Sequence, residues 1–98
     1  MESERKPRVE IEYCTQCRFI LRATWMAQEL LTTFEDDIGG ITLVPGRGGV
    51  FEIRRADGTP IWSRRNDGGF PQPAELKRRV RDLVAPEKPL GHSDRDKG

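Results

Sequence analysis

The chain has 98 residues, of which 35% are hydrophobic and 34% charged, a composition typical of one small globular domain with a modest core. Its formal net charge of +1 argues against a general polyanion-binding protein. The sequence has no apolar run of the roughly 18 residues that a membrane span needs, and its charged N-terminus lacks a secretory signal, so we expect a cytoplasmic protein.

The N-terminal part predicts a leader and a strand. Residues 1–7 are mostly charged and end at a proline, which indicates a flexible leader outside the folded domain. Residues 8–13 then alternate strictly, with apolar Val9, Ile11 and Tyr13 separated by charged side chains. This period of two predicts a strand with one buried and one solvated face.

Residues 19–34 have helical periodicity. Apolar residues recur there every three or four positions, which predicts an amphipathic helix of about four turns. Aspartates and glycines at 36–40 end this helix, and the run "ITLVP" at 41–45 then predicts a short strand. The apolar residues of the helix are Phe19, Ile20, Ala23, Met26, Ala27, Leu30, Leu31 and Phe34.

Residues 50–65 predict a β-hairpin. The dipeptide Asp57-Gly58 separates two β-prone runs and favours a two-residue turn with positive φ at both positions. Such a turn pairs Ile53 with Trp62. Because Pro60 has no backbone N–H to donate, we expect the second strand of the hairpin at the edge of the sheet.

The C-terminal part predicts a helix followed by a tail. Pro73 suits the first turn of a helix, and residues 73–84 carry an apolar stripe on one face. Residues 86–98 are rich in proline, glycine and charge and are expected to be disordered. The single histidine, His92, lies in this tail and is not expected to be catalytic. The folded domain is therefore expected at residues 8–85.

These elements follow the order β-α-β-β-β-α. Because the first helix connects two strands, these strands should be parallel and joined by a right-handed crossover. The charged face of the first strand indicates that helices cover only one side of the sheet. We therefore predict an α/β two-layer sandwich with a four-stranded mixed sheet.

Both cysteines of the chain, Cys14 and Cys17, are predicted to lie in the loop after the first strand and in the first turn of the next helix. A helix N-terminus presents unpaired N–H groups and partial positive charge, which favour thiolate over thiol. Arg18 and Arg22 follow closely and are candidates for lowering the pKa of the cysteines further. The two-residue spacing lets one sulfur resolve a mixed disulfide formed by the other, so the pattern indicates a reversible redox pair.

Three other roles for the cysteine pair stay open at this point. A structural disulfide across so short a loop would add only about 2 kcal/mol, and a reducing compartment would remove it. A structural zinc ion needs four ligands, so two chains would have to share it. Inert, buried cysteines are disfavoured by the loop position.

Several features together resemble the Rdx family, the group of selenoproteins T, W and H. These features are the Tyr-Cys-x-x-Cys at the end of the first strand, the long amphipathic helix, and the segments Gly49–Ile53 and Ile61–Pro71. The resemblance spans residues 8–85 and is closest to selenoprotein W-like bacterial proteins with cysteine in place of selenocysteine. It implies a thioredoxin-like fold and thiol-based redox activity. It also implies glutathione or a thioredoxin-type protein as the reductant. The sequence itself has no motif for a metal, a flavin or a nucleotide, so no bound cofactor is expected.

The resemblance also bears on which cysteine attacks first. In the selenoproteins of this family, selenocysteine occupies the second position of the motif, which is Cys17 here. The mechanism of thioredoxin favours the first position, which is Cys14. We favour Cys17 as the redox-tuned member and leave the order of attack open.

Two glycine-containing loops are candidate substrate or partner sites. Thioredoxins hold substrate near a cis-proline before the third strand; this chain has Gly48 and Gly49 there, which would let a substrate backbone approach closely. Gly69 and Phe70 lie in a polar loop before the last helix. Phe70 is either an exposed docking point for a protein partner or a cap on that helix. The sequence has no recognition motif for nucleic acid.

The sequence therefore favours a cytoplasmic thiol-disulfide redox protein that acts in redox homeostasis. Whether it is an enzyme, a thiol-disulfide oxidoreductase, stays open. The alternative from another class is a soft-metal carrier that binds copper or zinc through the same two cysteines. A protein-docking module without catalysis is the third hypothesis. The sequence does not determine the substrate, the reductant or the oligomeric state.

Overall fold

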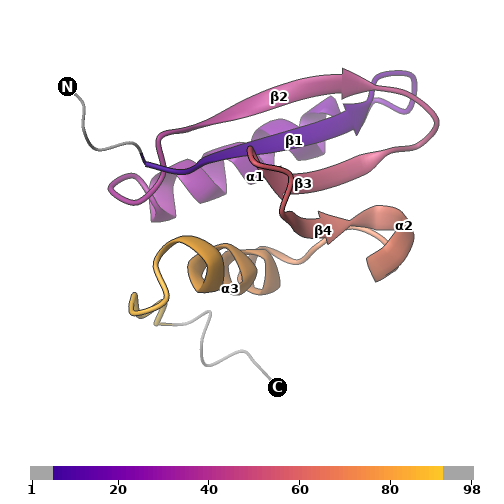
Figure 1. The fold of residues 1–98 in the computed structure, drawn as a ribbon. Coiled ribbons are helices and arrows are strands. Elements are labelled where there is room, and N and C mark those ends of the chain that lie inside the picture. Colours follow the sequence, from indigo (N-terminus) through magenta and orange to yellow (C-terminus); the bar gives the residue numbers. More distant parts are fainter. Residues whose placement is uncertain (1–5, 92–98) are drawn as a thin grey trace.

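The computed structural model describes residues 6–91, and the predicted leader up to residue 5 and the tail from His92 lie outside the described residues. Within these residues the chain forms four strands and two longer helices, α1 and α3, in the order expected, together with one additional short helix, α2 (Figure 1). None of the described helices is long and apolar enough to cross a membrane. The elements are β1 (Arg8–Cys14), α1 (Ile20–Thr33), β2 (Gly40–Gly46), β3 (Phe51–Arg55), β4 (Pro60–Ser63), α2 (Arg64–Asp67) and α3 (Pro73–Val84).

The four strands form one mixed sheet in the order β2-β1-β3-β4. β1 and β2 are parallel, as a helical crossover requires, whereas β1 pairs with β3 and β3 with β4 in antiparallel fashion. β4, which begins at Pro60, lies at one edge of the sheet, as predicted. The mixed four-stranded sheet expected from the sequence is thereby confirmed.

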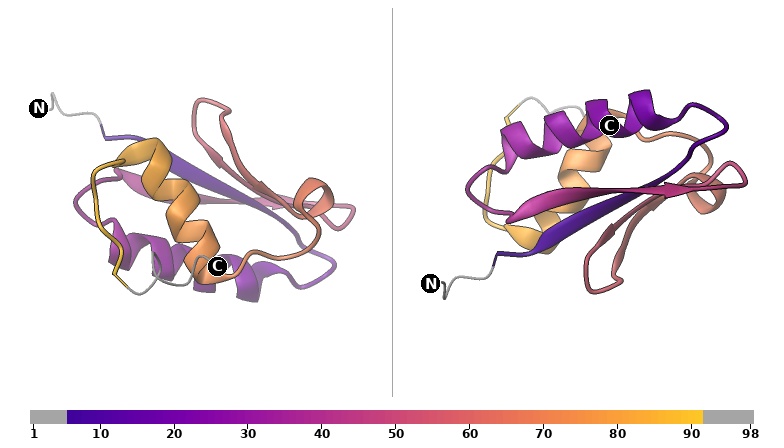
Figure 2. Two further views of the ribbon diagram at one scale, coloured as in Figure 1. Left: turned by 90° about the horizontal axis from the view of Figure 1, so that it is seen from below. Right: turned by 90° about the horizontal axis from the view of Figure 1, so that it is seen from above.

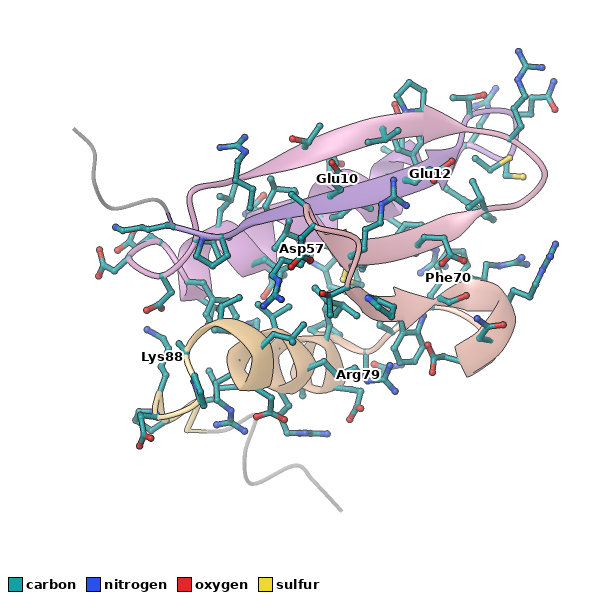
Figure 3. The ribbon with its side chains drawn as sticks, in the orientation of Figure 1. Glu10, Glu12, Asp57, Phe70, Arg79 and Lys88 are labelled. Carbon is teal, nitrogen blue, oxygen red and sulfur yellow. The ribbon has the colours of Figure 1, made fainter. Side chains whose placement is uncertain are left out.

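The two faces of the sheet differ as the alternation in β1 predicted. Val9 and Ile11 are fully buried in the core beneath the helices. Glu10 and Glu12 point from the opposite face, where Arg54 of β3 donates to them at 2.9 and 3.1 Å (Figure 3). Both α1 and α3 lie on one side of the sheet and contact each other, while the tip of the β3–β4 hairpin points away from them (Figure 2). The protein is a two-layer sandwich.

Helix α1 matches its predicted extent to within one residue at each end. Of the expected apolar stripe, Ala23, Met26, Ala27, Leu30 and Phe34 are buried in the core. Ile20 and Leu31 are exposed instead, because the stripe was wider than the face that α1 turns toward the sheet. Leu21 and Trp25 are also exposed, with Leu21 74% accessible.

The turn of the β3–β4 hairpin differs from the prediction of a two-residue turn, which is wrong. The N–H of Arg55 donates to the carbonyl of Thr59 at 2.8 Å, so the loop contains three residues. Within this loop only Gly58 has positive φ, at 100°. Asp57 accepts hydrogen bonds from the N–H of Thr59 at 3.0 Å and from its hydroxyl at 2.8 Å, and this local pairing favours the longer loop. The predicted pairing of Ile53 with Trp62 is confirmed.

Helix α2 was not predicted, although a local hydrogen-bond pattern explains it. The hydroxyl of Ser63 accepts from the N–H of Asn66 at 3.2 Å, and the carboxylate of Asp67 accepts from the N–H of Ser63 at 2.9 Å. These reciprocal bonds satisfy donors that a single helical turn leaves free. Gly68, with φ of 83°, ends the turn in the left-handed conformation.

The chain after α3 folds back onto the domain. Lys88 forms an ion pair of 3.0 Å with Asp37, and its carbonyl accepts a hydrogen bond of 3.0 Å from Arg81. Leu90 packs against the core. Residues 86–91, the described part of the predicted tail, are therefore in contact with the domain.

Candidate functional site

Three segments that are far apart in the sequence meet at one end of the sheet. They are the β1–α1 loop with both cysteines, the β2–β3 loop with Gly48 and Gly49, and α2 (Figure 1). The parallel pairing of β1 with β2 sets Cys14 opposite Gly46, so both strands end at the same level. The Cys14 N–H then donates to the carbonyl of Val50 at 2.9 Å, which fixes the β2–β3 loop beside the cysteines.

The two sulfur atoms lie 2.7 Å apart, joined by a hydrogen bond between the free cysteines. Cys14 is the last residue of β1 and is only 1% exposed, whereas Cys17 is exposed. The pair thus presents one sulfur to solvent and keeps the other behind it.

Cys17 lies in the loop rather than in the first turn of α1, which corrects its predicted position. The helix begins only at Ile20, because residues 14–19 form turns in which the Arg18 N–H donates to Thr15 at 3.1 Å and the Phe19 N–H to Cys14 at 3.3 Å. Arg18 takes a left-handed φ of 61°, which is uncommon for a residue with a Cβ atom. The amides near the sulfurs therefore belong to loops and not to the helix terminus.

The pKa of Cys14 is lowered, because Cys17 donates a hydrogen bond to its sulfur and the N–H groups of Gly49, Cys17 and Gln16 also face it; burial opposes this effect. The pKa of Cys17 is raised, because its proton is held in the bond to Cys14 and because a second negative charge beside Cys14 is unfavourable. The Gly49 amide and the charge of Arg64 act on Cys17 in the opposite direction. The pair consequently loses its first proton readily and its second with difficulty.

Arg64, the first residue of α2, was missed by the sequence analysis. Its guanidinium donates to the carbonyl of Gly49 at 3.2 Å and lies 5.4 Å from the ring centroid of Phe19. The "SRRND" capping pattern was the only signal that could have placed it, and that pattern predicts a helix start, not a contact across the fold. Arg64 thus links α2 to the β2–β3 loop and to the base of the cysteine loop.

Phe70 packs inward, against the aromatic side chains below the cysteine loop. Its ring lies 4.9 Å from that of Phe19 and 5.1 Å from that of Phe51, both in edge-to-face geometry. The guanidinium of Arg22 covers Phe70 at 4.2 Å. The carbonyl of the neighbouring Gly69 accepts from the indole N–H of Trp62 at 2.8 Å. The Phe70 loop therefore supports the site from below (Figure 3).

A groove of about 530 Å³ runs from the β2–β3 loop to α2. Gly48 and Gly49 line it with positive φ values of 70° and 77°. Its wall also contains Arg64, which it shares with the cysteine site. The full lining is Arg47, Gly48, Gly49, Val50, Phe51, Glu52, Ser63, Arg64, Arg65 and Asn66.

Of the residues predicted for the site, Cys14, Cys17 and Gly49 come together. Gly48 lines the adjoining groove. Arg18 belongs to the cysteine loop, and Arg22 contacts the ring of Phe70. These positions do not test whether either arginine lowers the pKa of a cysteine, which stays a prediction. Among residues 6–91, no three histidine, cysteine or acidic side chains gather into a metal-binding group.

The similarity of this chain to known proteins extends over most of the described residues. The model of the Rdx family matches residues 8–82. No curated protein matches the chain.

Two solved structures share the fold at high sequence identity. A crystal structure of a protein from Bordetella parapertussis is 59% identical, with a TM-score of 0.77, and the match covers 80% of this chain and 98% of that one. A selenoprotein W-related protein from Vibrio cholerae is 50% identical, with a TM-score of 0.76, over 80% of this chain and 96% of that one.

Proposed function

The chain belongs to the Rdx family and has its thioredoxin-like fold, and on this premise we propose that it is a thiol-disulfide redox protein whose Cys14–Cys17 pair cycles between dithiol and disulfide. The observation that carries the proposal is the 2.7 Å separation of an exposed and a buried sulfur. The family is generally associated with redox chemistry, which supports the same conclusion.

In the proposed mechanism, Cys17 attacks first because its sulfur is exposed and that of Cys14 is not. The Cys17 thiolate attacks one sulfur of a substrate disulfide, forms a mixed disulfide and releases the other substrate sulfur as a thiolate. The Cys14 thiolate then attacks the Cys17 sulfur, which closes the Cys14–Cys17 disulfide and releases the second substrate thiolate. Two electrons pass to the substrate, and the two protons of the cysteines end on its thiols.

The surroundings of the pair act differently on the two steps: with the pKa of Cys14 lowered and that of Cys17 raised, Cys17 attacks from the less populated of the two singly charged forms. The Gly49 amide and Arg64 favour the thiolate form of Cys17 when Cys14 holds the shared proton. Three backbone N–H groups then favour the thiolate of Cys14, which is the form needed for the second attack. Cys14 gives its proton to the substrate thiolate that the first attack releases, and it thereby becomes the resolving thiolate.

The oxidised pair needs a reductant to complete the cycle. We assign this role to glutathione or to a thioredoxin-type dithiol in the cytoplasm. Two glutathione molecules, or one dithiol, return two electrons and two protons to the cysteines and leave as a disulfide. No metal or prosthetic group takes part in this scheme.

The proposal is tested by the reduction potential of the pair, measured by equilibrating metal-free protein in glutathione redox buffers and quantifying free thiols by mass spectrometry. We expect one two-electron transition between about −300 and −150 mV, the range of thioredoxins and glutaredoxins. The Cys14→Ser and Cys17→Ser variants serve as controls and should lack the transition. If no intramolecular disulfide forms across this range, the proposed function is wrong.

A further inference from the structure

The groove beside the cysteine pair carries an excess of positive charge. Arg47, Arg64 and Arg65 line it, against a single carboxylate, that of Glu52. Within residues 6–91, none of these three arginines forms an ion pair with a carboxylate. The Glu52 carboxylate is itself engaged, since it accepts from the Ser63 hydroxyl at 2.7 Å. The groove therefore favours a negatively charged ligand.

The same groove adjoins the reactive sulfurs through two shared residues. Gly49 lines the groove, and its N–H faces both sulfur atoms. Arg64 lines the groove as well, and its charge acts on Cys17. Val50, a third lining residue, accepts a hydrogen bond of 2.9 Å from the Cys14 N–H, so a chain lying in the groove would lie beside the cysteine loop.

The backbone of the groove suits an extended polypeptide. Beyond the adjacent residues of the chain, nothing lies within 4 Å of the position where a Cβ of Gly48 would be, and at Gly49 only the Arg64 side chain comes that near. The loop thus leaves open space on this side, where a substrate backbone can approach. Arg47 in the β2–β3 loop and Arg65 in α2 are both exposed and line the groove, so their side chains can turn toward acidic side chains.

We propose that this groove binds an acidic segment next to the disulfide of a polypeptide substrate, so that the protein selects its substrates by negative charge. The proposal rests on the proposed redox function of the pair. The reaction is the exchange described above: Cys17 bonds to one substrate sulfur, the substrate S–S bond breaks, and Cys14 displaces the substrate as the Cys14–Cys17 disulfide forms. The substrate gains two electrons and two protons, and the protein loses them.

The test compares three peptide disulfides that differ only in the residues beside the cysteine, which are glutamate, glutamine or lysine. Pre-reduced protein is mixed with each peptide, and the single-turnover rate is measured at low and at high ionic strength. We expect the glutamate peptide to react roughly tenfold faster than the glutamine peptide at low ionic strength, because attraction raises the encounter rate. Salt should shrink this ratio, and the lysine peptide should be slowest.

A double variant, Arg47→Gln with Arg65→Gln, should bring the glutamate-to-glutamine rate ratio close to one. A matched control, Arg55→Gln with Arg78→Gln, removes two arginines outside the groove and should keep the wild-type ratio. If the wild type reduces all three peptides at equal rates, the charge selection is wrong while the redox function stands. If the ratio is high but unchanged in the groove variant, the groove is not the binding site.

A binding measurement separates this inference from the redox proposal. A fluorescent glutamate peptide with serine in place of cysteine cannot react, and its anisotropy reports binding alone. Tighter binding of this peptide than of its glutamine counterpart, lost in the groove variant, supports the acidic groove even if no peptide is reduced. The absence of any such preference overturns it.

Discussion

Arg64 donates a hydrogen bond of 3.2 Å to the carbonyl of Gly49, the residue whose N–H faces both sulfur atoms of the cysteine pair. Gly49 is thus held from two sides: its carbonyl bonds to Arg64 of α2, and its N–H faces the cysteine loop. The arginine also places its positive charge near Cys17. A helix of a single turn therefore contributes to the electrostatics of the cysteine site.

Replacing Arg64 with alanine should slow the alkylation of Cys17 by iodoacetamide at neutral pH by about threefold, because the pKa of Cys17 rises and less thiolate is present. Arg64→Lys keeps the charge and should restore part of the rate. A pH profile of the alkylation rate separates this effect from a loss of structure, since only the former moves the midpoint upward. Arg78→Ala, on α3, is the control for net charge, and an identical profile in Arg64→Ala and Arg78→Ala would contradict the role of Arg64.

The two cysteines should titrate differently when each is left alone. In Cys17→Ala, Cys14 loses the main hydrogen-bond donor to its sulfur, so its pKa should rise. In Cys14→Ala, Cys17 loses the hydrogen bond to Cys14, the largest cause that raises its pKa, and the nearby charge of Cys14, so its pKa should fall. The ultraviolet absorbance of the thiolate, followed against pH, measures both. Shifts in the opposite directions would show that the two sulfurs do not share a proton.

The order of attack can be read from trapped mixed disulfides. Cys14→Ser leaves the exposed Cys17 without a resolving partner, so a mixed disulfide with a peptide substrate should accumulate. Cys17→Ser leaves only the buried Cys14, which should form the same adduct at least about tenfold more slowly. Intact-mass spectrometry at short reaction times gives both rates. Faster trapping on Cys14 would reverse the assignment and favour a thioredoxin-like order.

Arg79 is expected to stabilise the fold beneath the site. It donates to the carbonyl of Ile61 at 2.9 Å and to Glu75 at 3.0 Å, and it lies 4.5 Å from the ring centroid of Trp62 (Figure 3). Arg79→Met should lower the free energy of unfolding by about 1–2 kcal/mol, because one carbonyl loses its donor and the indole loses a cation. Urea denaturation checks this value. Arg79→Lys retains the charge, so its free energy of unfolding should lie between those of the wild type and Arg79→Met. An unchanged urea midpoint in Arg79→Met would refute the stabilising role of Arg79.

Asp57 provides a prediction on pH. Hydrogen bonds from Arg55 and then from Thr59 hold the pKa of the Asp57 carboxyl well below its usual range. Such a group stabilises the fold above its unfolded-state pKa of about 3.9, and this stabilisation disappears as the pH falls through the folded-state pKa. Asp57→Asn should therefore be less stable than wild type at neutral pH, and the difference in urea midpoint should shrink in strong acid. A difference that does not change with pH would mean that the charge of Asp57 is irrelevant.

The fold could be predicted from the sequence where one periodicity dominated. The strict alternation in β1 and the apolar stripe of α1 each fix one buried face, and the crossover between parallel strands then determines the neighbours. The hairpin loop could not be predicted in detail, because the carboxylate of Asp57 reorganises the turn through bonds that no dipeptide rule includes. The exposure of Leu31 likewise depends on how α1 is rotated against the sheet, which local periodicity does not determine.

The cysteine site was predictable in its chemistry and not in its geometry. The spacing of Cys14 and Cys17 predicted that the two sulfurs act as a pair. Which sulfur is buried follows instead from the length of β1 and from the turns up to Phe19. Arg64 contacts Gly49 only because β3 and β4 bring two segments 15 residues apart to one end of the sheet. Contacts of this kind arise from the assembled fold, and a single sequence carries no local signal for them.

The burial of Cys14 behind Cys17 also bears on how the site withstands oxidants. Peroxide reaches the exposed Cys17 first and converts its thiolate to a sulfenic acid, the last stage before irreversible damage begins. A second sulfur at 2.7 Å can displace water from that sulfenic acid at once and form the disulfide. We therefore expect the arrangement to divert Cys17 from sulfinic and sulfonic acids, so that oxidative stress leaves the protein in a form that thiols can repair.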